Sequence, residues 1–210
     1  MSYNNKIELF GLPGAGKSTI SDVNFNQYFN CNKEFIYDDN RIVRNLKKVK
    51  NLIQLSKYGC YYYVKVYRYI KNVVSYKLKL KMYIYMASTI NISIKGLKSQ
   101  KKLIILEEGM LQVLWALCYN SSITNQEQKS FIYDYVTDFK ELFMPEIICI
   151  KTDYDVIKKR LIERNGSGGS ELQRDIKRDE KILNKAILVE KNILDILKQQ
   201  RVSMNFLKGD

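Results

Sequence analysis

Residues 11–19 read Gly-Leu-Pro-Gly-Ala-Gly-Lys-Ser-Thr and follow a short, mostly apolar run at residues 7–10. This stretch matches the pattern G-x-x-x-x-G-K-[ST], a loop that binds phosphate where a strand precedes it and a helix follows. Its glycines let the chain turn tightly, so that backbone N–H groups face a bound anion at the positive end of the next helix. The motif therefore constrains the chain to begin with a strand, a phosphate loop and a helix.

The same loop predicts contacts to a nucleotide and its metal ion. Lys17 is expected to reach the β- and γ-phosphates of ATP, and the Ser18 hydroxyl is expected to bind Mg²⁺. The residues expected to contact the nucleotide are Gly11, Pro13, Gly14, Ala15, Gly16, Lys17, Ser18 and Thr19.

Length and composition indicate one globular domain. The chain has 210 residues, of which 46% are hydrophobic, enough for a substantial core. Its longest nearly apolar stretch, residues 110–119, is about half the length that a membrane span needs. The phosphate loop starts too early to leave room for a signal peptide, so we expect the protein to be cytoplasmic.

The absence of histidine excludes several reaction classes. Ser-His-Asp triads, Cys–His nucleophiles, histidine metal sites and phosphohistidine relays all need the imidazole. Any proton transfer must therefore use a carboxylate, Lys or Tyr.

The four cysteines are scattered without a C-x-x-C pair, which indicates free thiols rather than a disulfide framework or a zinc site.

The positive charge is concentrated in one segment. Between Arg41 and Lys102 the sequence contains sixteen Lys and Arg residues and no Asp or Glu, although the net charge of the whole chain is only +13. Nine of the sixteen tyrosines lie there as well. An AT-rich genome explains abundant Lys and Tyr codons but not the missing acids. The segment therefore predicts contact with an anionic ligand or surface.

Periodicity and breaker residues predict alternating strands and helices. Strands are expected at residues 6–10, 34–37, 102–106, 146–151 and 202–207. Helices are expected after the phosphate loop to residue 29, in two or more pieces between 42 and 96, and at 110–117, 126–143, 153 onward and 179–199. The fold class is therefore α/β, a parallel sheet of about five strands flanked by helices, with a helical insertion after the second strand.

Four polar clusters follow the predicted strands at their carboxyl ends, where ligands bind in such sheets. They are the phosphate loop, Asp38–Arg41, Glu107–Glu108 and Lys151–Asp153. Within the last cluster, Thr152 is expected to cap the next helix, with Asp155 completing a capping box. Because parallel strands end at one edge of a sheet, the four clusters predict a single active site.

On these features the chain resembles the P-loop kinase family, in the branch of nucleoside monophosphate and thymidylate kinases, small-metabolite kinases and polynucleotide 5′-kinases. The resemblance rests on the loop at 11–19, the acidic end of the strand at 103–106 and the segment Pro145–Arg174. It implies a single kinase domain over residues 1–210, with an acceptor-side segment at 42–100 and a lid at 160–178. Residues 42–100 themselves match no part of that family.

The resemblance also implies a lid that carries arginines. Arg160 and Arg164 lie one helical turn apart, and Arg174 follows the Gly-Ser loop at 166–170. These arginines would stabilise the charge of the transferring phosphoryl group when the lid closes and excludes water. Arg178 is a fourth candidate.

Further roles are implied for the acidic clusters. The stretch Asp38-Asp39-Asn40-Arg41 is similar to a D-D-x-R stretch that holds and deprotonates an acceptor hydroxyl, which would make Asp38 the base. Arg41 and Arg44, with Asp39 and Glu108, would contact the acceptor. Glu107 would organise Mg²⁺, although that family usually carries Asp there, and the sequence does not separate Glu107 from Glu108.

Three functions stay open. The first is an ATP-dependent kinase for a small anionic metabolite, such as a nucleotide, nucleoside or sugar derivative. The second is a polynucleotide 5′-hydroxyl kinase, favoured by the D-D-x-R stretch and by basic residues interleaved with tyrosines able to stack on bases. The third is a nucleotide-binding switch or motor, but the chain has no N-K-x-D guanine motif, and the predicted lid favours transfer.

Overall fold

The computed structural model contains a five-stranded sheet in which every strand runs parallel to its neighbours. The strand order is β2-β3-β1-β4-β5, with β1 (Lys6–Phe10) between β3 (Ile104–Leu106) and β4 (Glu146–Lys151). The edges are β2 (Phe29–Asn30) and β5 (Met204–Lys208). The inner strands are short buried runs, as expected for strands covered on both faces, and all five strands end at one edge of the sheet.

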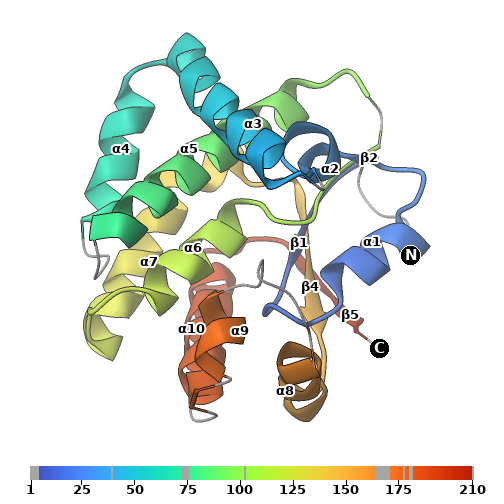
Figure 1. Ribbon diagram of the computed structural model, residues 1–210, viewed down its shortest axis with the longest axis vertical. Coiled ribbons are helices and arrows are strands. Elements are labelled where there is room, and N and C mark those ends of the chain that lie inside the picture. Colours follow the sequence, from blue (N-terminus) through green and yellow to red (C-terminus); the bar gives the residue numbers. More distant parts are fainter. Residues whose placement is uncertain are drawn as a thin grey trace.

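The structure describes residues 5–38, 40–71, 76–101, 103–163, 171–176, 178–179 and 182–209, without the side chains of Arg41 and Glu171. Helices flank the sheet (Figure 1). Their bounds are α1 Lys17–Asn24, α2 Cys31–Phe35, α3 Arg41–Gln54, α4 Tyr61–Ile70, α5 Tyr76–Lys98, α6 Met110–Tyr119, α7 Asn125–Phe139, α8 Tyr154–Glu163, α9 Glu171–Ile176 and α10 Ile182–Gln199. Short 3-10 helices follow α3 at Leu55–Tyr58 and α7 at Lys140–Leu142.

This architecture confirms the predicted α/β class, a parallel sheet of five strands flanked by helices. The predicted helical insertion after the second strand is also present, as α3, α4 and α5. In Figure 1 this insertion occupies the upper left of the molecule, where α3 packs on α5 and α5 packs in turn on α6. The long insertion therefore stands beside the edge of the sheet formed by β3 and β2.

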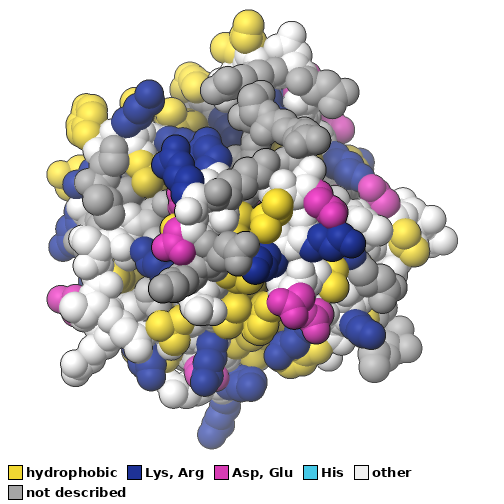
Figure 2. All heavy atoms as spheres, turned by 60° about the horizontal axis from the view of Figure 1, so that its bottom comes forward, with side chains coloured by type: hydrophobic (Ala, Val, Ile, Leu, Met, Phe, Trp, Pro, Cys, Tyr) yellow, Lys and Arg dark blue, Asp and Glu magenta, His cyan; other side chains and the backbone are white. Residues whose placement is uncertain are grey.

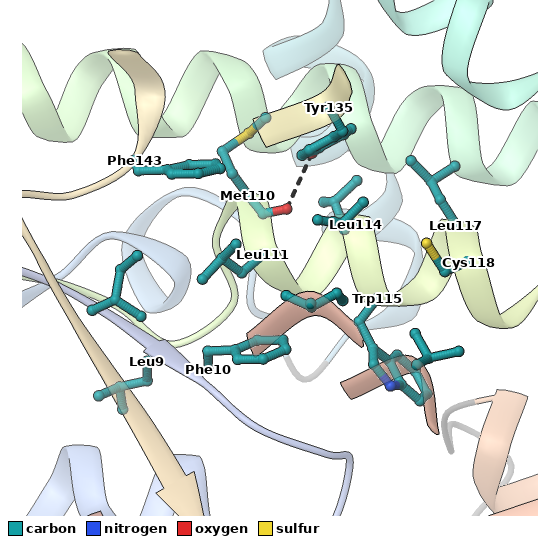
Figure 3. Packing of buried hydrophobic residues seen from close by; sticks show 14 of the residues in the cluster. Leu9, Phe10, Met110, Leu111, Leu114, Trp115, Leu117, Cys118, Tyr135 and Phe143 are labelled. Carbon is teal, nitrogen blue, oxygen red and sulfur yellow. Dashed lines mark hydrogen bonds between the residues drawn. The ribbon is translucent and has the colours of Figure 1, made fainter. Parts of the chain in front are cut away.

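Part of the core lies where α6 packs over the central strand. Figure 3 shows apolar side chains of α6 between Phe10 of β1 and Tyr135 of α7. The Tyr135 hydroxyl donates a hydrogen bond of 3.1 Å to the Met110 carbonyl, and all these residues are buried. Burying one such large side chain contributes about 1.5–3 kcal/mol. The packing fixes α6 and, with it, the turn at Glu107–Gly109 that leads into the helix.

One carboxyl group, that of Glu8, is buried in this core. Its Oε1 accepts a hydrogen bond of 2.8 Å from the backbone N–H of Leu111 in α6. Burial raises the pKa of Glu8 to about 7, because the charged form loses its hydration. Gly109 lies directly against Glu8, and a Cβ atom at position 109 would overlap the carboxyl group. A side chain at position 109 would therefore require the buried Glu8 carboxyl group to move.

Two predicted elements are wrong. Residues 34–37 do not form a strand, since they belong to α2 and the turn after it, and the helix after the phosphate loop ends at Asn24. The cause is Asn30, whose side chain accepts a hydrogen bond of 3.0 Å from the Lys33 N–H and so caps α2 directly after β2. The apolar Ile36 packs with Ile92 of α5 rather than within the sheet.

The other elements agree with the prediction to within a few residues. The strands at 6–10 and 146–151 have the expected bounds, whereas β3 begins at Ile104 and β5 covers Met204–Lys208. The stretch predicted as one helix over 126–143 is α7 followed by a 3-10 helix. A real capping box, formed by Thr124 and Glu127, starts α7.

Figure 2 shows the face that appears when the bottom of Figure 1 is turned forward, and on that face the positive charge of the described residues forms no single patch. Their Lys and Arg side chains are spread over it, with Asp and Glu side chains between them. None of the described helices is both long enough and apolar enough to cross a membrane.

Candidate active site

The phosphate loop joins β1 to α1 at the carboxyl edge of the sheet, as predicted. Gly14 and Gly16 both have φ near 91°, a left-handed backbone conformation that favours glycine. The loop is closed by a hydrogen bond of 3.0 Å from the Ala15 N–H to the Leu12 carbonyl. Helix α1 then begins at Lys17, so the positive end of its dipole faces the loop.

Lys17 folds over this loop. Its Nζ donates hydrogen bonds to the carbonyl oxygens of Gly11 at 2.8 Å and Leu12 at 3.2 Å. The ammonium group therefore lies above the loop that its motif assigns to phosphate.

A second carboxyl group, that of Glu190 on α10, bonds to the backbone of the loop. Glu190 accepts a hydrogen bond from the backbone N–H of Leu12 and lies near the ammonium groups of Lys17 and Lys151. Burial raises the pKa of Glu190 to about 7, and the two cations oppose that rise. Glu190 also lines a cavity of about 330 Å³ between α8 and α10. Sequence reasoning missed this residue, because a single Glu within an amphipathic helix carries no signal.

Ser18 and Glu107 meet at the predicted metal site. The Ser18 hydroxyl donates a hydrogen bond of 3.2 Å to Glu107 Oε2, and Glu107 is almost fully buried. The other oxygen, Oε1, accepts from Asn30 Nδ2 at 2.5 Å, while Lys33 Nζ lies 3.9 Å away. Mg²⁺ prefers oxygen ligands and is commonly held by one or two protein groups together with phosphates and water. The hydroxyl and carboxylate of this pair fit that requirement.

The structure separates the two neighbouring glutamates. The backbone of Glu108 is clamped by Asn32, which donates to its carbonyl at 2.9 Å and accepts from its N–H at 3.2 Å. The Glu108 side chain thereby faces the helical insertion, where its Oε2 accepts a hydrogen bond of 3.3 Å from the Tyr85 hydroxyl. The Tyr37 hydroxyl also bonds to Glu108. Glu107 thus faces the phosphate loop and Glu108 faces α5.

Two cations of the insertion approach this second cluster. Burial lowers the pKa of the partly buried Lys48, and the negative charge of Glu108 opposes that decrease. The positive charge of Arg44 adds to the decrease at Lys48 and opposes the rise in the pKa of Tyr37. The pKa of Tyr37 and that of Tyr85 are raised by burial first and by Glu108 next, so both phenols stay protonated as hydrogen-bond donors. We call Tyr37, Arg44, Lys48, Tyr85 and Glu108 the Glu108 cluster.

Asp38, the predicted base, lies at the start of α3. One of its oxygens accepts a hydrogen bond of 3.0 Å from the Asn40 N–H and the other lies 3.2 Å from Lys47 Nζ. These contacts lower the pKa of Asp38, the Asn40 bond first. Asp39 is outside the described residues, as is the side chain of Arg41.

One predicted lid arginine reaches the phosphate loop. Arg160 of α8 donates a hydrogen bond of 3.3 Å from Nη1 to the Gly14 carbonyl. Ile157 and Leu161 of the same helix would touch any side chain at position 14, so α8 packs directly on the loop. Arg164 and the Gly-Ser loop at 166–170 lie outside the described residues. Arg174 on α9 and Arg178 after it are exposed.

The predicted role of Thr152 is wrong. Asp153 starts α8, because its side chain accepts a hydrogen bond of 2.8 Å from the Asp155 N–H. The Thr152 hydroxyl instead donates to the Ala15 carbonyl at 2.8 Å. The end of β4 is thereby fastened to the phosphate loop.

These groups share one edge of the sheet. The phosphate loop lies between Arg160 on one side and the Ser18–Glu107 pair on the other, and the Glu108 cluster continues from that pair toward α5. Sequence reasoning placed Lys48 one turn after Arg44 on the acceptor side, but it missed Asn30, Asn32, Tyr37 and Tyr85. The signal for Asn30 was its position as the N-cap of α2. That signal was overlooked because residues 34–37 were predicted to be a strand.

Comparisons with known proteins place the fold. No known protein family and no curated protein matches this chain. Among solved structures, the chain is similar to a deoxyadenosine kinase from M. mycoides with products dCMP and a flexible dCDP bound, at 17% identity and a TM-score of 0.52, over 98% of this chain and 90% of that chain. It is also similar to deoxyadenosine kinase from M. mycoides with bound dATP, at 16% identity and a TM-score of 0.50, over 97% and 91%. The likeness shows the fold, an α/β P-loop domain.

Proposed function

We propose that this protein is an ATP-dependent kinase that transfers the γ-phosphoryl group to a small acceptor of the nucleoside or nucleotide class. The observation that carries the proposal is the convergence of the phosphate loop, the Ser18–Glu107 pair and Arg160 at one edge of the sheet. Phosphoryl transfer depends mainly on positioning and on stabilising negative charge, and these groups are suited to both tasks.

The nucleotide would bind with its phosphates on the loop and at the start of α1. Charged phosphate oxygens are stronger acceptors than carbonyl groups, so Lys17 would leave Gly11 and Leu12 for the β- and γ-phosphates. Ser18 and Glu107 would hold Mg²⁺, which when bound would neutralise charge on those phosphates. Arg160 would exchange the Gly14 carbonyl for a phosphate oxygen.

The acceptor would bind at the Glu108 cluster. A carboxylate flanked by two phenols suits the hydroxyl or amino groups of a sugar or base, while Arg44 and Lys48 supply positive charge for a phosphate. The structures similar in fold hold dCMP, dCDP or dATP, which supports an acceptor of this class.

Two carboxylates are candidates for the base that activates the acceptor. Asp38 has the D-D-x-R context, but it must release Lys47 before it can accept a proton. Glu107 is the alternative, since it lies beside Ser18 and is almost fully buried. Turnover of Asp38→Asn and Glu107→Gln at saturating Mg²⁺ distinguishes them, because a base variant lowers kcat whereas a metal variant is rescued in part by more metal.

The function is tested by following phosphoryl transfer from ATP to a panel of nucleosides, nucleotides and sugars. We expect ADP formation that depends on one acceptor class, and its loss in Lys17→Ala but not in Lys129→Ala, which changes an exposed lysine on α7. ADP formation that needs no acceptor would contradict the kinase and favour a nucleotide-hydrolysing switch.

A polynucleotide kinase is the second candidate, and the exposed tyrosines of the insertion favour it. Tyr61, Tyr67 and Tyr76 are exposed, as bases stacking on them would require, although Tyr62 and Tyr69 are buried. Binding of a single-stranded oligonucleotide that weakens steeply with added salt would support this candidate over the first.

A further inference from the structure

Helix α3 exposes an apolar stripe to solvent. Ile42, Leu46, Val49 and Ile53 recur at helical spacing and therefore lie on one side of the helix. Their exposed fractions are 71%, 62%, 39% and 66%. Surface helices of globular proteins normally bury this side against the core. We call these four residues the α3 stripe.

The opposite, inward side of α3 is polar. Asn51 is buried there, and its amide donates a hydrogen bond of 2.9 Å to the Phe35 carbonyl. Its Oδ1 accepts from Asn91 Nδ2 at 2.7 Å and from Lys95 Nζ at 3.0 Å, both on α5. The Ser88 hydroxyl, also on α5, donates to the Lys48 carbonyl at 2.8 Å.

These polar contacts fix the rotation of α3. Turning the helix to bury the stripe would move Asn51 into solvent and leave the buried Asn91 amide without its hydrogen bond, which costs about 1–3 kcal/mol. The stripe therefore faces outward in the folded chain. Figure 1 shows α3 at the outside of the molecule, beyond α5.

Lysines gather at the C-terminal end of the stripe. Lys50 follows Val49 on α3, and Lys57 lies in the 3-10 helix after α3. Both are exposed. Burial lowers the pKa of Lys95, which lies on the inward side of α3, and the charges of these two lysines lower it further. Lys98, also exposed, lies one turn further along α5, over the ring of Tyr58. The sequence from Arg41 to Lys102 offers no Asp or Glu to neutralise them.

The charge decides among the surfaces that could cover the stripe. A second copy packed on α3 would set the acid-free, positively charged segment against itself, and like charges oppose association. Nucleic acid binds through phosphate contacts and aromatic stacking, which four aliphatic side chains do not provide. An interface that is both apolar and anionic satisfies the stripe and the lysines at once.

We propose that the α3 stripe and its lysines bind the surface of an anionic lipid membrane. Helix α3 lies in the plane of the interface, with Ile42, Leu46, Val49 and Ile53 among the acyl chains and Lys50 and Lys57 at the headgroups. The convex side of a helix needs no shaped groove for this, unlike binding to a protein. The inference is independent of the proposed kinase activity.

The test is co-sedimentation of the full chain with two kinds of vesicle. We expect binding to phosphatidylcholine vesicles that contain phosphatidylserine, weak binding to phosphatidylcholine alone, and release as salt is raised. Leu46→Asn and Ile53→Asn should each lower the partition coefficient about tenfold. Leu188→Asn, at an exposed residue of α10, is the matched control and should leave binding unchanged.

The lysines are tested separately. Lys50→Ser should lower the partition coefficient about fivefold, while Lys129→Ser on α7 should not change it. Thermal unfolding of each variant checks the fold, and none should melt at a lower temperature, because the substituted side chains are exposed.

Three results would overturn the proposal. The first is failure of the intact chain to sediment with phosphatidylserine vesicles. The second is equal binding by the stripe variants and Leu188→Asn, which would assign the binding to general positive charge. The third is a dimer, measured by light scattering, that Leu46→Asn dissociates, which would assign the stripe to a second copy.

Discussion

The Ser18 hydroxyl donates a hydrogen bond to the Glu107 carboxylate, although 89 positions separate the two residues in the chain. The bond joins the start of α1 to the end of β3 across the carboxyl edge of the sheet. It brings together the two residues that the sequence nominates for Mg²⁺, and it rests on the parallel register of β1 with β3.

Loss of the Glu107 carboxylate should lower kinase activity more than nucleotide binding. We expect Glu107→Gln to reduce turnover about ten- to a hundredfold and to raise the Mg²⁺ concentration needed for half-maximal rate. Steady-state rates over a Mg²⁺ titration measure both effects. Glu141→Gln, at an exposed carboxylate, is the control, and an unchanged Mg²⁺ dependence in Glu107→Gln would remove Glu107 from the metal site.

Lys17→Ala should cut turnover by roughly a hundredfold or more while the protein stays folded. The ammonium is a fixed cation placed above the phosphate loop, and removing one such preorganised group has an effect of this size. Acceptor phosphorylation and the unfolding temperature should be measured together. Equal transfer rates in Lys17→Ala and the unchanged protein would eliminate the phosphate-loop assignment.

Arg160→Ala should weaken ATP binding or slow transfer by about tenfold. Arg160 already contacts the Gly14 carbonyl, so it needs little movement to reach a phosphate, and a charge-assisted hydrogen bond contributes about 1.5–3 kcal/mol. Calorimetric titration with a non-hydrolysable ATP analogue provides the affinity. Lys159→Ala changes the neighbouring exposed cation, and the same loss in both variants would point to general charge instead.

Arg44→Ala should raise the KM for the acceptor about tenfold and leave ATP affinity unchanged. Arg44 belongs to the Glu108 cluster, where its charge opposes the rise in the pKa of Tyr37, and this cluster is the proposed acceptor site. Initial rates at varied acceptor and fixed ATP measure this. In Lys77→Ala, which alters an exposed lysine of α5, acceptor kinetics should be normal. A normal acceptor KM in Arg44→Ala would move the acceptor away from this cluster.

The buried Glu8 should make the protein less stable as pH rises. A glutamate exposed to water has a pKa of 4.5, whereas the pKa of Glu8 in the folded chain is about 7. Below pH 4.5 both the folded and the unfolded state carry the proton, and between these values only the folded state keeps it, so the free energy of unfolding decreases toward pH 7. The total decrease from this group is about 3 kcal/mol and levels off above pH 7.

Urea unfolding of Glu8→Gln across that pH range measures this contribution. The variant should lack the decrease assigned to Glu8 and retain the one assigned to Glu190, whose pKa is raised similarly. Parallel pH profiles for Glu8→Gln and the unchanged protein would show that Glu8 is ionised in the folded state.

Local patterns predicted what depends on local sequence. The phosphate loop, the buried strands at 6–10 and 146–151, and the acidic turn at Glu107 follow from glycine spacing and apolar runs alone. The parallel sheet then brings Ser18 and Glu107 to one edge without further information.

What the sequence could not provide depends on contacts between distant segments. The run Phe35–Tyr37 has the composition of a strand, and only the Asn30 cap and the packing of Ile36 on α5 make this region helix and turn. The sequence does not distinguish Glu107 from Glu108. They differ in the fold because Asn32 forms hydrogen bonds with both the N–H and the carbonyl of Glu108. Similarly, the amphipathic pattern of α3 predicts a helix. Which side of that helix faces inward depends on hydrogen bonds with Asn91 and Lys95, about forty residues away.

The contact between Gly109 and Glu8 has a consequence for the divergence of this protein. Because the carboxyl group of Glu8 lies where a Cβ atom of residue 109 would be, a change at one position alters the space available at the other. Homologues that keep a long side chain at position 8 should keep glycine at 109, and those with a small residue at 8 should tolerate alanine there. An alignment in which positions 8 and 109 change together would show how α6, and with it Glu107 and Glu108, has stayed in place.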